Sequence, residues 1–469
     1  MIHQTDTIVA CATPTGGAIA VVRMSGRDAI AIAERMFRPR GRRSLADAEG
    51  YTAHYGEVID STGEVIDDVV LTLFRAPRSY TGEDSVEISC HGSAYLVGRI
   101  VRQAIDCGAR AATAGEFTTR AFLAGKIDLA QAEGVADMIA STDRATHRLA
   151  LNQMRGGFST ELRGMRDELL HLSALLELEL DFAEEEVEFA DRTTLRQIMT
   201  TIDNHLARLI DSFALGNALK EGIATAIVGA PNAGKSTLLN RLLNEDRAMV
   251  SDIAGTTRDS IEESMVISGR RFRVIDTAGI RSTDDSLEQM GIDRTFTSLR
   301  RAAVVLLVCD CSTWSDHEDS HDAAAAVCST IDDLQLNDDQ ILITILNKCD
   351  CVSAQFVAKL QSELAGEVLT ISARTGEGVE KVITSLSRIA EAMTAEASDT
   401  VVTSARHYEA LSNARWALRR AFEGMDNGLP SDLLSEEIRQ VIYHLGTITG
   451  EITTDEILGQ IFSKFCIGK

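Results

Sequence analysis

The loop from Gly229 to Ser236 is the segment whose residue types point most directly to chemistry. It has the pattern G-x-x-x-x-G-K-[ST] and lies between an apolar run, Ile223 to Val228, and a helical pattern. In such a loop backbone N–H groups and the helix N-terminus face phosphate oxygens, Lys235 reaches the β- and γ-phosphates, and Ser236 offers an oxygen to Mg²⁺. The spacing therefore predicts a site for a nucleoside triphosphate and Mg²⁺.

Two later motifs indicate which base this site would accept. The segment Asn347 to Asp350 follows the apolar run Ile341 to Leu346. The Asp350 carboxylate can accept hydrogen bonds from N1–H and the exocyclic amine of guanine, a pair of donors that adenine lacks. Ser372 to Arg374 follows a further apolar run and completes a rim around the base. These motifs predict a GTPase; an ATPase is the alternative, and Asp350 argues against it.

The hydrolytic residues are expected between and after these motifs. Asp276 to Gly279 follows another apolar run, where an Asp lies beyond Mg²⁺ and a glycine amide meets the γ-phosphate. Gly255 to Asp259 has the position of a switch loop, and we expect Thr257 to contact the metal and the γ-phosphate. Ile280 is apolar and cannot orient a water molecule, so we expect an acid of the following switch to do so.

The predicted GTP contacts are residues of these motifs, together with Thr237 after the phosphate-binding loop and Ser251 to Ala254 before the switch loop. They are Asn232, Ala233, Gly234, Lys235, Ser236, Thr237, Ser251, Asp252, Ile253, Ala254, Gly255, Thr256, Thr257, Asp276, Thr277, Ala278, Gly279, Asn347, Lys348, Asp350, Ser372, Ala373 and Arg374. Of these residues, Ser236 and Thr257 are predicted to bind Mg²⁺.

The elements that position these motifs alternate strand-like and helical patterns over residues 216–385, which predicts a parallel α/β sheet. Long helical patterns fill residues 121–215, and helical patterning returns over residues 386–469. Residues 1–120 mix β-like runs with a helical run. We therefore predict a multidomain chain, α/β plus all-α, in which an N-terminal α+β domain precedes a discontinuous helical domain with an inserted Ras-like P-loop GTPase domain.

Composition excludes several other classes of protein. The 469 residues carry 46 Lys and Arg against 70 Asp and Glu, a net charge of −24, so a non-specific polyanion binder is not expected. Hydrophobic residues make up 45% and charged residues 25%, which is close to the average of globular proteins. Neither a signal-peptide pattern nor a long apolar run is found, and the nine cysteines form no C-x-x-C pair, so we expect a reduced cytoplasmic protein.

Three segments outside the nucleotide motifs are typical of one family. They are the start Asp6 to Ala10, the stretch Gly115 to Leu123, and the C-terminal Phe465 to Lys469, which ends in Cys-Ile-Gly-Lys. Together with the embedded GTPase motifs, they make the whole chain resemble the MnmE (TrmE) family of tRNA-modification GTPases. The C-terminal segment is the most specific part of the resemblance, because no general physical rule requires Cys-Ile-Gly-Lys at a carboxyl end.

The resemblance implies an activity, cofactors and partners. It implies a homodimer joined through the N-terminal domains, residues 1–120, each folate-binding-like and holding 5-formyl-tetrahydrofolate or a related tetrahydrofolate. With an FAD- and NADH-using partner, MnmG (GidA), the family installs a carboxymethylaminomethyl-type group at C5 of the tRNA wobble uridine. The resemblance also implies that K⁺ and dimerisation of the GTPase domains stimulate GTP hydrolysis.

The resemblance further assigns residues to the modification site. Arg23, Glu87, Lys126 and Lys469 would line the folate site, where cations and an acid suit a glutamate tail and a donor-rich pterin ring. Cys466 belongs to the C-terminal segment. If the helical domain carries this segment to the folate site, Cys466 would act in the modification step as nucleophile or as proton donor.

In the GTPase domain the resemblance assigns a potassium site and a catalytic acid. Side-chain and carbonyl oxygens of Asn232, Ser251, Ile253 and Thr256 would bind K⁺, a hard cation. Glu288 precedes a Gly-Ile pair as the family's catalytic acid does, and we expect it to position the attacking water.

Two other functions compete with a tRNA-modifying GTPase. One is a regulatory GTPase switch in ribosome assembly, and the other is a folate-dependent transferase with an unrelated GTPase insert. The first class usually appends an RNA-binding module to its GTPase domain, whereas this domain is embedded in helices. The embedding and the C-terminal segment therefore favour the tRNA-modifying enzyme.

Overall fold

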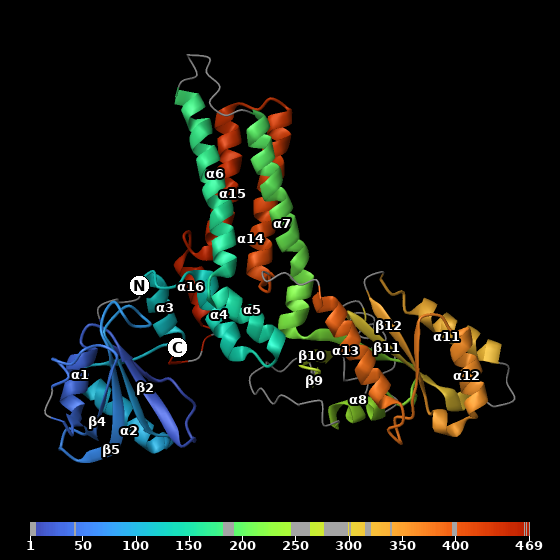
Figure 1. The fold of residues 1–469 in the computed structure, drawn as a ribbon, viewed down its shortest axis with the longest axis horizontal. Coiled ribbons are helices and arrows are strands. Elements are labelled where there is room, and N and C mark those ends of the chain that lie inside the picture. The colour runs from blue at the N-terminus through green and yellow to red at the C-terminus, as the bar shows by residue number, and fades with distance from the viewer. Residues whose placement is uncertain are drawn as a thin grey trace. The chain divides into compact units, whose positions relative to one another are not determined.

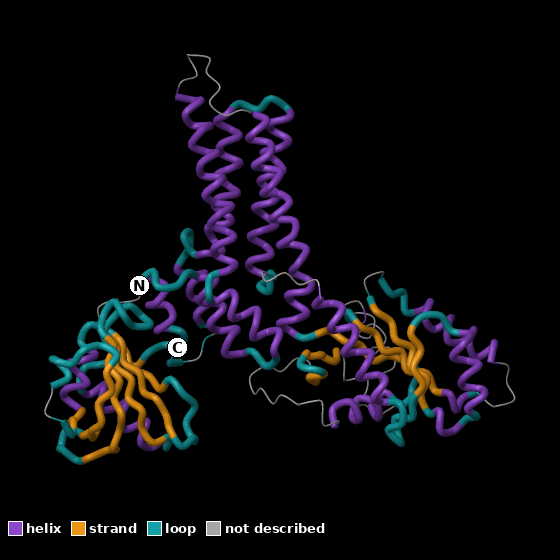
Figure 2. The backbone as a smooth tube through the Cα atoms, in the orientation of Figure 1, coloured by secondary structure: helices purple, strands orange, loops and turns teal. Residues whose placement is uncertain are grey.

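The computed structural model of the chain describes residues 6–41, 44–181, 192–244, 263–275, 299, 302–314, 320–337, 340–395, 401–463, 465 and 467–468 (Figures 1 and 2). The chain divides into two compact units. The first comprises Met1–Ile139, Gln153–Ile198 and Trp416–Lys469, and the second comprises Ala140–Asn152 and Met199–Arg415. The helices α5 (Arg144–Met154), α7 (Arg192–Glu221) and α14 (Ala405–Asp426) contribute residues to both units.

The first unit contains a seven-stranded sheet in the order β3-β4-β5-β6-β2-β1-β7. Its strands are β1 (Ile8–Cys11), β2 (Ile19–Ser25), β3 (Phe37–Pro39), β4 (Thr52–Ile59), β5 (Val65–Phe74), β6 (Ser85–His91) and β7 (Arg110–Ala111). The strands pair antiparallel except for β1 and β7. Two helices, α1 (Ala29–Met36) and α2 (Ala94–Asp106), contact each other and share one core with the sheet. The predicted β-like runs and helical run of residues 1–120 are confirmed.

The same unit contains helices from both ends of the chain, namely α3 (Glu116–Leu123), α4 (Leu129–Ala140), α6 (Gly157–Asp181), α15 (Ser431–Thr449) and α16 (Asp455–Phe462). In Figure 1, α6 and α15 run side by side. Leucines at three- and four-residue steps on α6 are buried, and Ser173 and Ser435 hydrogen-bond across the pair at 3.3 Å. Periodic apolar residues thus join helices that are far apart in sequence.

The second unit contains a six-stranded sheet in the order β13-β12-β11-β8-β10-β9. Its strands are β8 (Ile223–Val228), β9 (Glu263–Ile267), β10 (Arg270–Ile275), β11 (Val304–Asp310), β12 (Ile341–Asn347) and β13 (Glu367–Thr370). All described pairs are parallel except β9 with β10. The prediction of a parallel sheet is confirmed.

Helices cover this sheet, as a parallel sheet requires. They are α8 (Lys235–Asn244), α11 (Ser320–Asp333), α12 (Ala354–Glu363) and α13 (Val379–Ala395), with 3₁₀ turns η2 (Cys311–Thr313) and η3 (Cys349–Cys351). Val304, Leu306 and Val308 of β11 share a core with α8 and α13, whereas Val305 and Leu307 belong to a separate core. The strand is therefore buried on both faces, which explains its unbroken apolar sequence.

The transition from helix to sheet lies later than predicted from the change of pattern near Gly216. The helix α7 continues through Gly216 to Glu221, and β8 begins at Ile223. A Cβ atom on Gly216 would lie 2.0 Å from the carbonyl oxygen of Val402. This glycine therefore permits another segment to approach the helix closely, rather than ending the helix. The domain boundaries at residues 120, 215 and 385 stay predictions.

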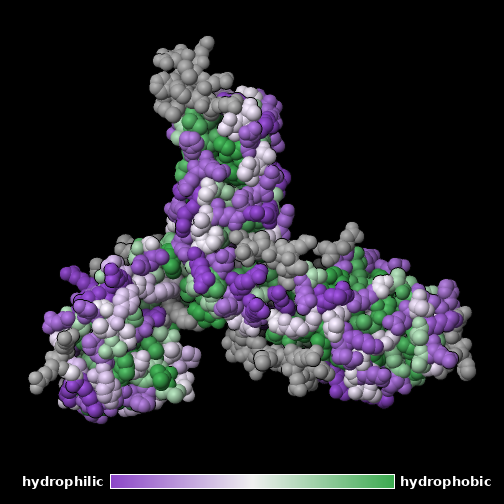
Figure 3. All heavy atoms as spheres, in the orientation of Figure 1, coloured by the Kyte–Doolittle hydropathy of each residue, from purple (hydrophilic) through white to green (hydrophobic). Residues whose placement is uncertain are grey.

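The surface shows no apolar belt on the face drawn in Figure 3, where hydrophilic and hydrophobic residues are intermixed over the coloured atoms. Within the described ranges, no helix has both the length and the apolar character needed to cross a membrane.

Candidate GTP-binding site

The phosphate-binding loop leaves β8 and enters α8, as the sequence predicts. Gly229 has φ +145° and Gly234 has φ +100°. A Cβ atom on Gly229 would lie 2.2 Å from the carbonyl oxygen of Val308, and one on Gly234 would lie 2.1 Å from the Asn347 amide nitrogen. Both positions therefore need glycine for backbone conformation and for space. A larger side chain at Gly229 would collide with β11, and one at Gly234 would collide with Asn347, so either would distort this phosphate-binding cradle.

Lys235 is the cation of this cradle. Its Nζ donates to the carbonyl oxygens of Gly229 at 2.8 Å and Ala230 at 2.7 Å. These two hydrogen bonds hold the ammonium group against the first residues of the loop. Burial lowers the pKa of Lys235 from its usual value, because desolvation disfavours the ammonium ion. A phosphate group beside Nζ would compensate for this desolvation. The loop and the N-terminus of α8 thus fit the phosphates of a nucleotide.

Asn347 joins the phosphate-binding loop to the predicted base-binding rim. The Asn347 side chain is 2% exposed. Its Nδ2 donates to the carbonyl oxygen of Ala233 at 2.7 Å, and its Oδ1 accepts from the backbone N–H of Ala373 at 2.9 Å. One buried amide therefore fixes the two halves of the predicted site relative to each other.

Lys348 and Asp350, which follow Asn347, are each held by an ion pair. Lys348 has φ +61°, and its Nζ lies 2.5 Å from Oδ2 of Asp310. Asp350 accepts a hydrogen bond from Arg374 at 2.6 Å. A hydrogen bond from Ser372, and the nearby Arg374 guanidinium, hold the pKa of Asp350 below its usual value. The carboxylate is therefore ionised at neutral pH, as an acceptor for guanine N1–H and the exocyclic amine must be.

Asp310 is a site residue that the sequence analysis missed. It ends β11, where the parallel register places it directly beside Asn347 at the end of β12. Its carboxylate also accepts from the backbone N–H of Ser312 at 2.9 Å. The sequence contained a signal for this role, since Asp310 ends an apolar run. Neighbouring parallel strands bring their carboxyl ends to one edge of the sheet, so an Asp at that position lies near the other site residues.

Several predicted site residues lie outside the described part of the chain, so nothing is stated of their structure. They are Ser251, Asp252, Ile253, Ala254, Gly255, Thr256, Thr257, Asp276, Thr277, Ala278, Gly279, Glu288, Cys466 and Lys469. Their roles stay predictions.

The predicted folate residues Arg23 and Glu87 lie together in the first unit. They are direct partners in the register of β2 and β6, and Arg23 Nε donates to Glu87 Oε1 at 2.8 Å. The Arg23 guanidinium also lies 5.8 Å from the ring centre of Tyr80 and 5.7 Å from that of Phe117. The pair is therefore backed by aromatic rings, which suits recognition of a flat ring system.

Lys126, which lies far from Arg23 in the sequence, contacts the loop that carries Tyr80. Its Nζ donates to the carbonyl oxygen of Pro77 at 3.0 Å, and its side chain lies beside Gly82. Since Pro77 and Gly82 flank Tyr80, one short loop contacts both Lys126 and Arg23.

A buried ion cluster, which the sequence analysis also missed, supports this loop. The Arg120 side chain is 2% exposed and pairs with Asp6 at 2.6 Å, Glu83 at 3.2 Å and Glu116 at 3.1 Å. Burial disfavours the charged form of Glu116, yet hydrogen bonds from Arg110 and Arg120 hold its pKa below the usual value. The cluster joins the N-terminal segment, the loop that carries Tyr80, and α3.

The C-terminal segment packs on the start of α3 and on the first strand. Ile467 forms an antiparallel bridge with Ala114. Gly468 has φ +99°, and a Cβ atom there would lie 2.2 Å from the carbonyl oxygen of Cys11. Phe465 is buried in a cluster with Leu129 and Phe462. Both described neighbours of Cys466 are therefore anchored on the first unit.

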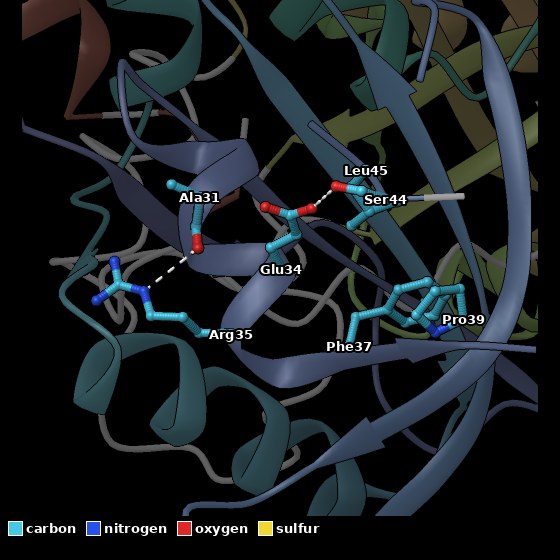
Figure 4. A pocket seen from close by; sticks show the side chains of 7 residues that line it. All are labelled: Ala31, Glu34, Arg35, Phe37, Pro39, Ser44 and Leu45. Carbon is cyan, nitrogen blue, oxygen red and sulfur yellow. Dashed lines mark hydrogen bonds between the residues drawn. The ribbon is translucent and has the colours of Figure 1, made fainter. Parts of the chain in front are cut away.

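A cavity of about 560 Å³ lies between α1 and β3 (Figure 4). Its lining includes Glu34, whose carboxylate accepts from Ser44, and Arg35, whose Nε donates to the carbonyl oxygen of Ala31. None of the predicted GTP or folate residues within the described part of the chain lines this cavity.

Two family models match the chain. The model of the MnmE helical domain matches residues 129–466, and that of the GTP-binding protein TrmE N-terminus matches residues 7–126. The tRNA modification GTPase MnmE of Flavobacterium johnsoniae is 46% identical over 474 residues, covering 100% of both chains. That of Christiangramia forsetii is 48% identical and covers 99% of both. The solved G domain of the T. maritima FeoB iron transporter is 22% identical over 35% of this chain and 97% of its own, with a TM-score of 0.24.

A phosphate-binding loop and a base-binding rim at the strand ends of a parallel sheet define a P-loop GTPase. Here that domain is inserted into a helical domain, which follows an N-terminal α+β domain, as the fold class was predicted. The chain belongs to the MnmE family of tRNA modification GTPases. It is a GTP hydrolase that acts in tRNA modification.

Proposed function

We propose that GTP hydrolysis by this chain serves the installation of a carboxymethylaminomethyl-type group at C5 of the tRNA wobble uridine, in the cytoplasm, with a tetrahydrofolate one-carbon unit. The observation that carries the GTPase half is the buried Asn347 amide, which joins the phosphate-binding loop to the base-binding rim. The test is a reconstituted reaction with tRNA, GTP and the FAD-dependent partner MnmG, in which the modified nucleoside is measured by mass spectrometry. Absence of the nucleoside, with GTP hydrolysis intact, would favour the regulatory GTPase instead.

In the GTPase domain we propose that Ser236 and Thr257 bind Mg²⁺. Asn232, whose φ of +60° gives the loop a left-handed residue, is proposed to bind K⁺ together with Ser251, Ile253 and Thr256. Glu288 is proposed to position the attacking water, since Ile280 has no polar group to do so.

We expect GTP hydrolysis to be at least roughly tenfold faster in potassium than in sodium chloride at equal ionic strength. A K⁺ ion held by these residues would supply the positive charge that an arginine finger supplies elsewhere. The measurement is phosphate release by the full chain in each salt, with ATP as the control substrate. Equal rates in the two salts would contradict the potassium site, and equal rates with ATP would contradict the assignment of Asp350.

In the N-terminal domain we propose that Arg23, Glu87, Lys126 and Lys469 hold the folate. The Arg23–Glu87 pair beside the Tyr80 and Phe117 rings supports this proposal, because it offers a donor, an acceptor and flat apolar faces in one place. The anchoring of Ile467 and Gly468 supports placing the C-terminal segment in the same domain.

We also propose that the chain is a homodimer joined through the N-terminal domain. Tyr55 and Val70 are cross-strand partners on β4 and β5, and both are exposed, so this sheet face offers apolar side chains to a second copy. Light scattering of the full chain should give twice its mass of 50.8 kDa, and Val70→Glu should give a single chain. A monomeric wild-type chain would contradict the dimer, and a dimeric variant would move the contact to another face.

A further inference from the structure

We propose that Arg241 is a positioning residue for guanine recognition, which clamps the base-binding rim onto the helix that follows the phosphate-binding loop. The inference depends on the GTP site proposed above. Arg241 lies on α8 and belongs to none of the nucleotide motifs. Its Nε donates to the carbonyl oxygen of Ala373 at 3.2 Å, and its Nη2 donates to that of Arg374 at 2.8 Å.

The two carbonyl groups belong to the rim that joins β13 to α13. On the N–H side of Ala373, the backbone donates to Asn347 Oδ1 at 2.9 Å. On the carbonyl side, Arg241 supplies the donor. Asn347 thus fixes the N–H group of Ala373, and Arg241 fixes its carbonyl group. The hydrogen bond from Arg241 is charge-assisted, because the guanidinium is a cation.

The clamp extends to the carboxylate predicted to read guanine. Arg241 fixes the carbonyl of Arg374, and the Arg374 side chain pairs with Asp350 at 2.6 Å. The Arg241 guanidinium reaches the two carbonyls with two different N–H groups, Nε and Nη2, whose relative positions are fixed by the planar fork, whereas an ammonium group would have to reach both from a single nitrogen. Loss of Arg241 would therefore free the rim and, through Arg374, change the placement of Asp350.

The helix α8 also connects the rim to the phosphate-binding loop. Lys235, at its first residue, faces the phosphate-binding loop, and Arg241 lies six residues later, about 9 Å along the helix axis. One rigid element therefore sets the spacing between the base and phosphate subsites. A nucleotide must span both subsites, so the clamp affects binding of the ground state rather than the hydrolytic step.

The experiment compares Arg241→Ala, Arg241→Lys and a matched control, Arg388→Ala, in the full chain. Arg388 lies on α13 in the same unit and pairs with Glu367 at 2.5 Å, away from the rim carbonyls. Calorimetry gives the Kd of each variant for GDP and for IDP, whose base lacks the exocyclic amine of guanine. Phosphate release gives kcat and KM for GTP, and thermal unfolding reports stability.

We expect Arg241→Ala to raise the Kd for GDP and the KM for GTP roughly fivefold to tenfold, with kcat within about twofold of wild type. The preference for GDP over IDP should fall as well, because the Asp350 carboxylate no longer faces the guanine amine correctly. Arg241→Lys should recover part of the loss, and Arg388→Ala should bind both nucleotides as wild type does.

Two results would overturn the inference. One is unchanged GDP affinity in Arg241→Ala. The other is an equal loss of GDP and IDP affinity together with a lower unfolding temperature, since that pattern describes a structural role. A wild-type chain that binds no GDP would instead overturn the GTP site itself, and this inference with it.

Discussion

Gly234→Ala should weaken GTP binding at least about thirtyfold. The added Cβ atom would lie 2.1 Å from the Asn347 amide nitrogen, so the side chain must move. That movement breaks its 2.7 Å hydrogen bond to Ala233 and leaves buried polar groups unpaired, at about 1–3 kcal/mol. The φ of +100° adds backbone strain of order 1 kcal/mol. The variant can relieve this cost by relaxing the loop and Asn347 away from the binding geometry, and it must then regain that geometry to bind GTP. A cost of roughly 2–4 kcal/mol met on binding corresponds to about thirtyfold or more in Kd.

Gly366→Ala is the matched control for this prediction. Gly366 also has a left-handed φ, +83°, and belongs to the same unit, but no atom of the described residues lies within 4 Å of the Cβ position. It therefore carries backbone strain without the collision. Calorimetric titration with GDP, together with thermal unfolding, separates the two effects. If the two variants bind equally well, the contact between the loop and Asn347 has no part in nucleotide binding.

The contrast between Asn347 and Arg241 shows which parts of the site a sequence can reveal. Asn347 lies within a short motif whose order and position at a strand end point to guanine. Arg241 acts through two backbone carbonyls, and every residue has a backbone carbonyl, so nothing in the sequence marks its partners. Its role follows only from the packing of α8 beside the rim. Roles of residues within short motifs could therefore be predicted from the sequence, whereas contacts that form only in the tertiary structure could not.

Gly216 and Arg120 illustrate the same limit in the fold. A glycine near the end of a helical pattern suggests that the helix stops there. Gly216 instead leaves room for the carbonyl group of Val402, a residue far along the chain. Nothing in the sequence marks Arg120 as buried, but its side chain lies buried among three carboxylates. In contrast, the alternation of β11 and β12 with helices predicts the parallel sheet, because apolar strands buried on both faces need helices on each side.

The C-terminal segment and Arg23 both lie near the start of α3. Ile467 bridges to Ala114, and a Cβ atom on Gly115 would lie 3.0 Å from that of Phe465. Two residues later, the Phe117 ring lies 5.7 Å from the Arg23 guanidinium. The two residues that flank Cys466 in sequence are thus anchored beside the element that backs Arg23. This arrangement supports a role for the Cys466 thiol in the modification step.

Cys466→Ser should therefore abolish tRNA modification in the reaction with the FAD-dependent partner, while the rate of GTP hydrolysis stays within about twofold of wild type. A hydroxyl is a far weaker nucleophile and acid than a thiol at neutral pH, and the GTP site belongs to the other compact unit. Mass spectrometry of tRNA nucleosides and phosphate release measure the two activities. Cys328→Ser, at an exposed position of α11, is the control and should modify tRNA normally. Normal modification by Cys466→Ser would reduce this thiol to a structural residue, whereas simultaneous loss of GTP hydrolysis would indicate misfolding instead of lost chemistry.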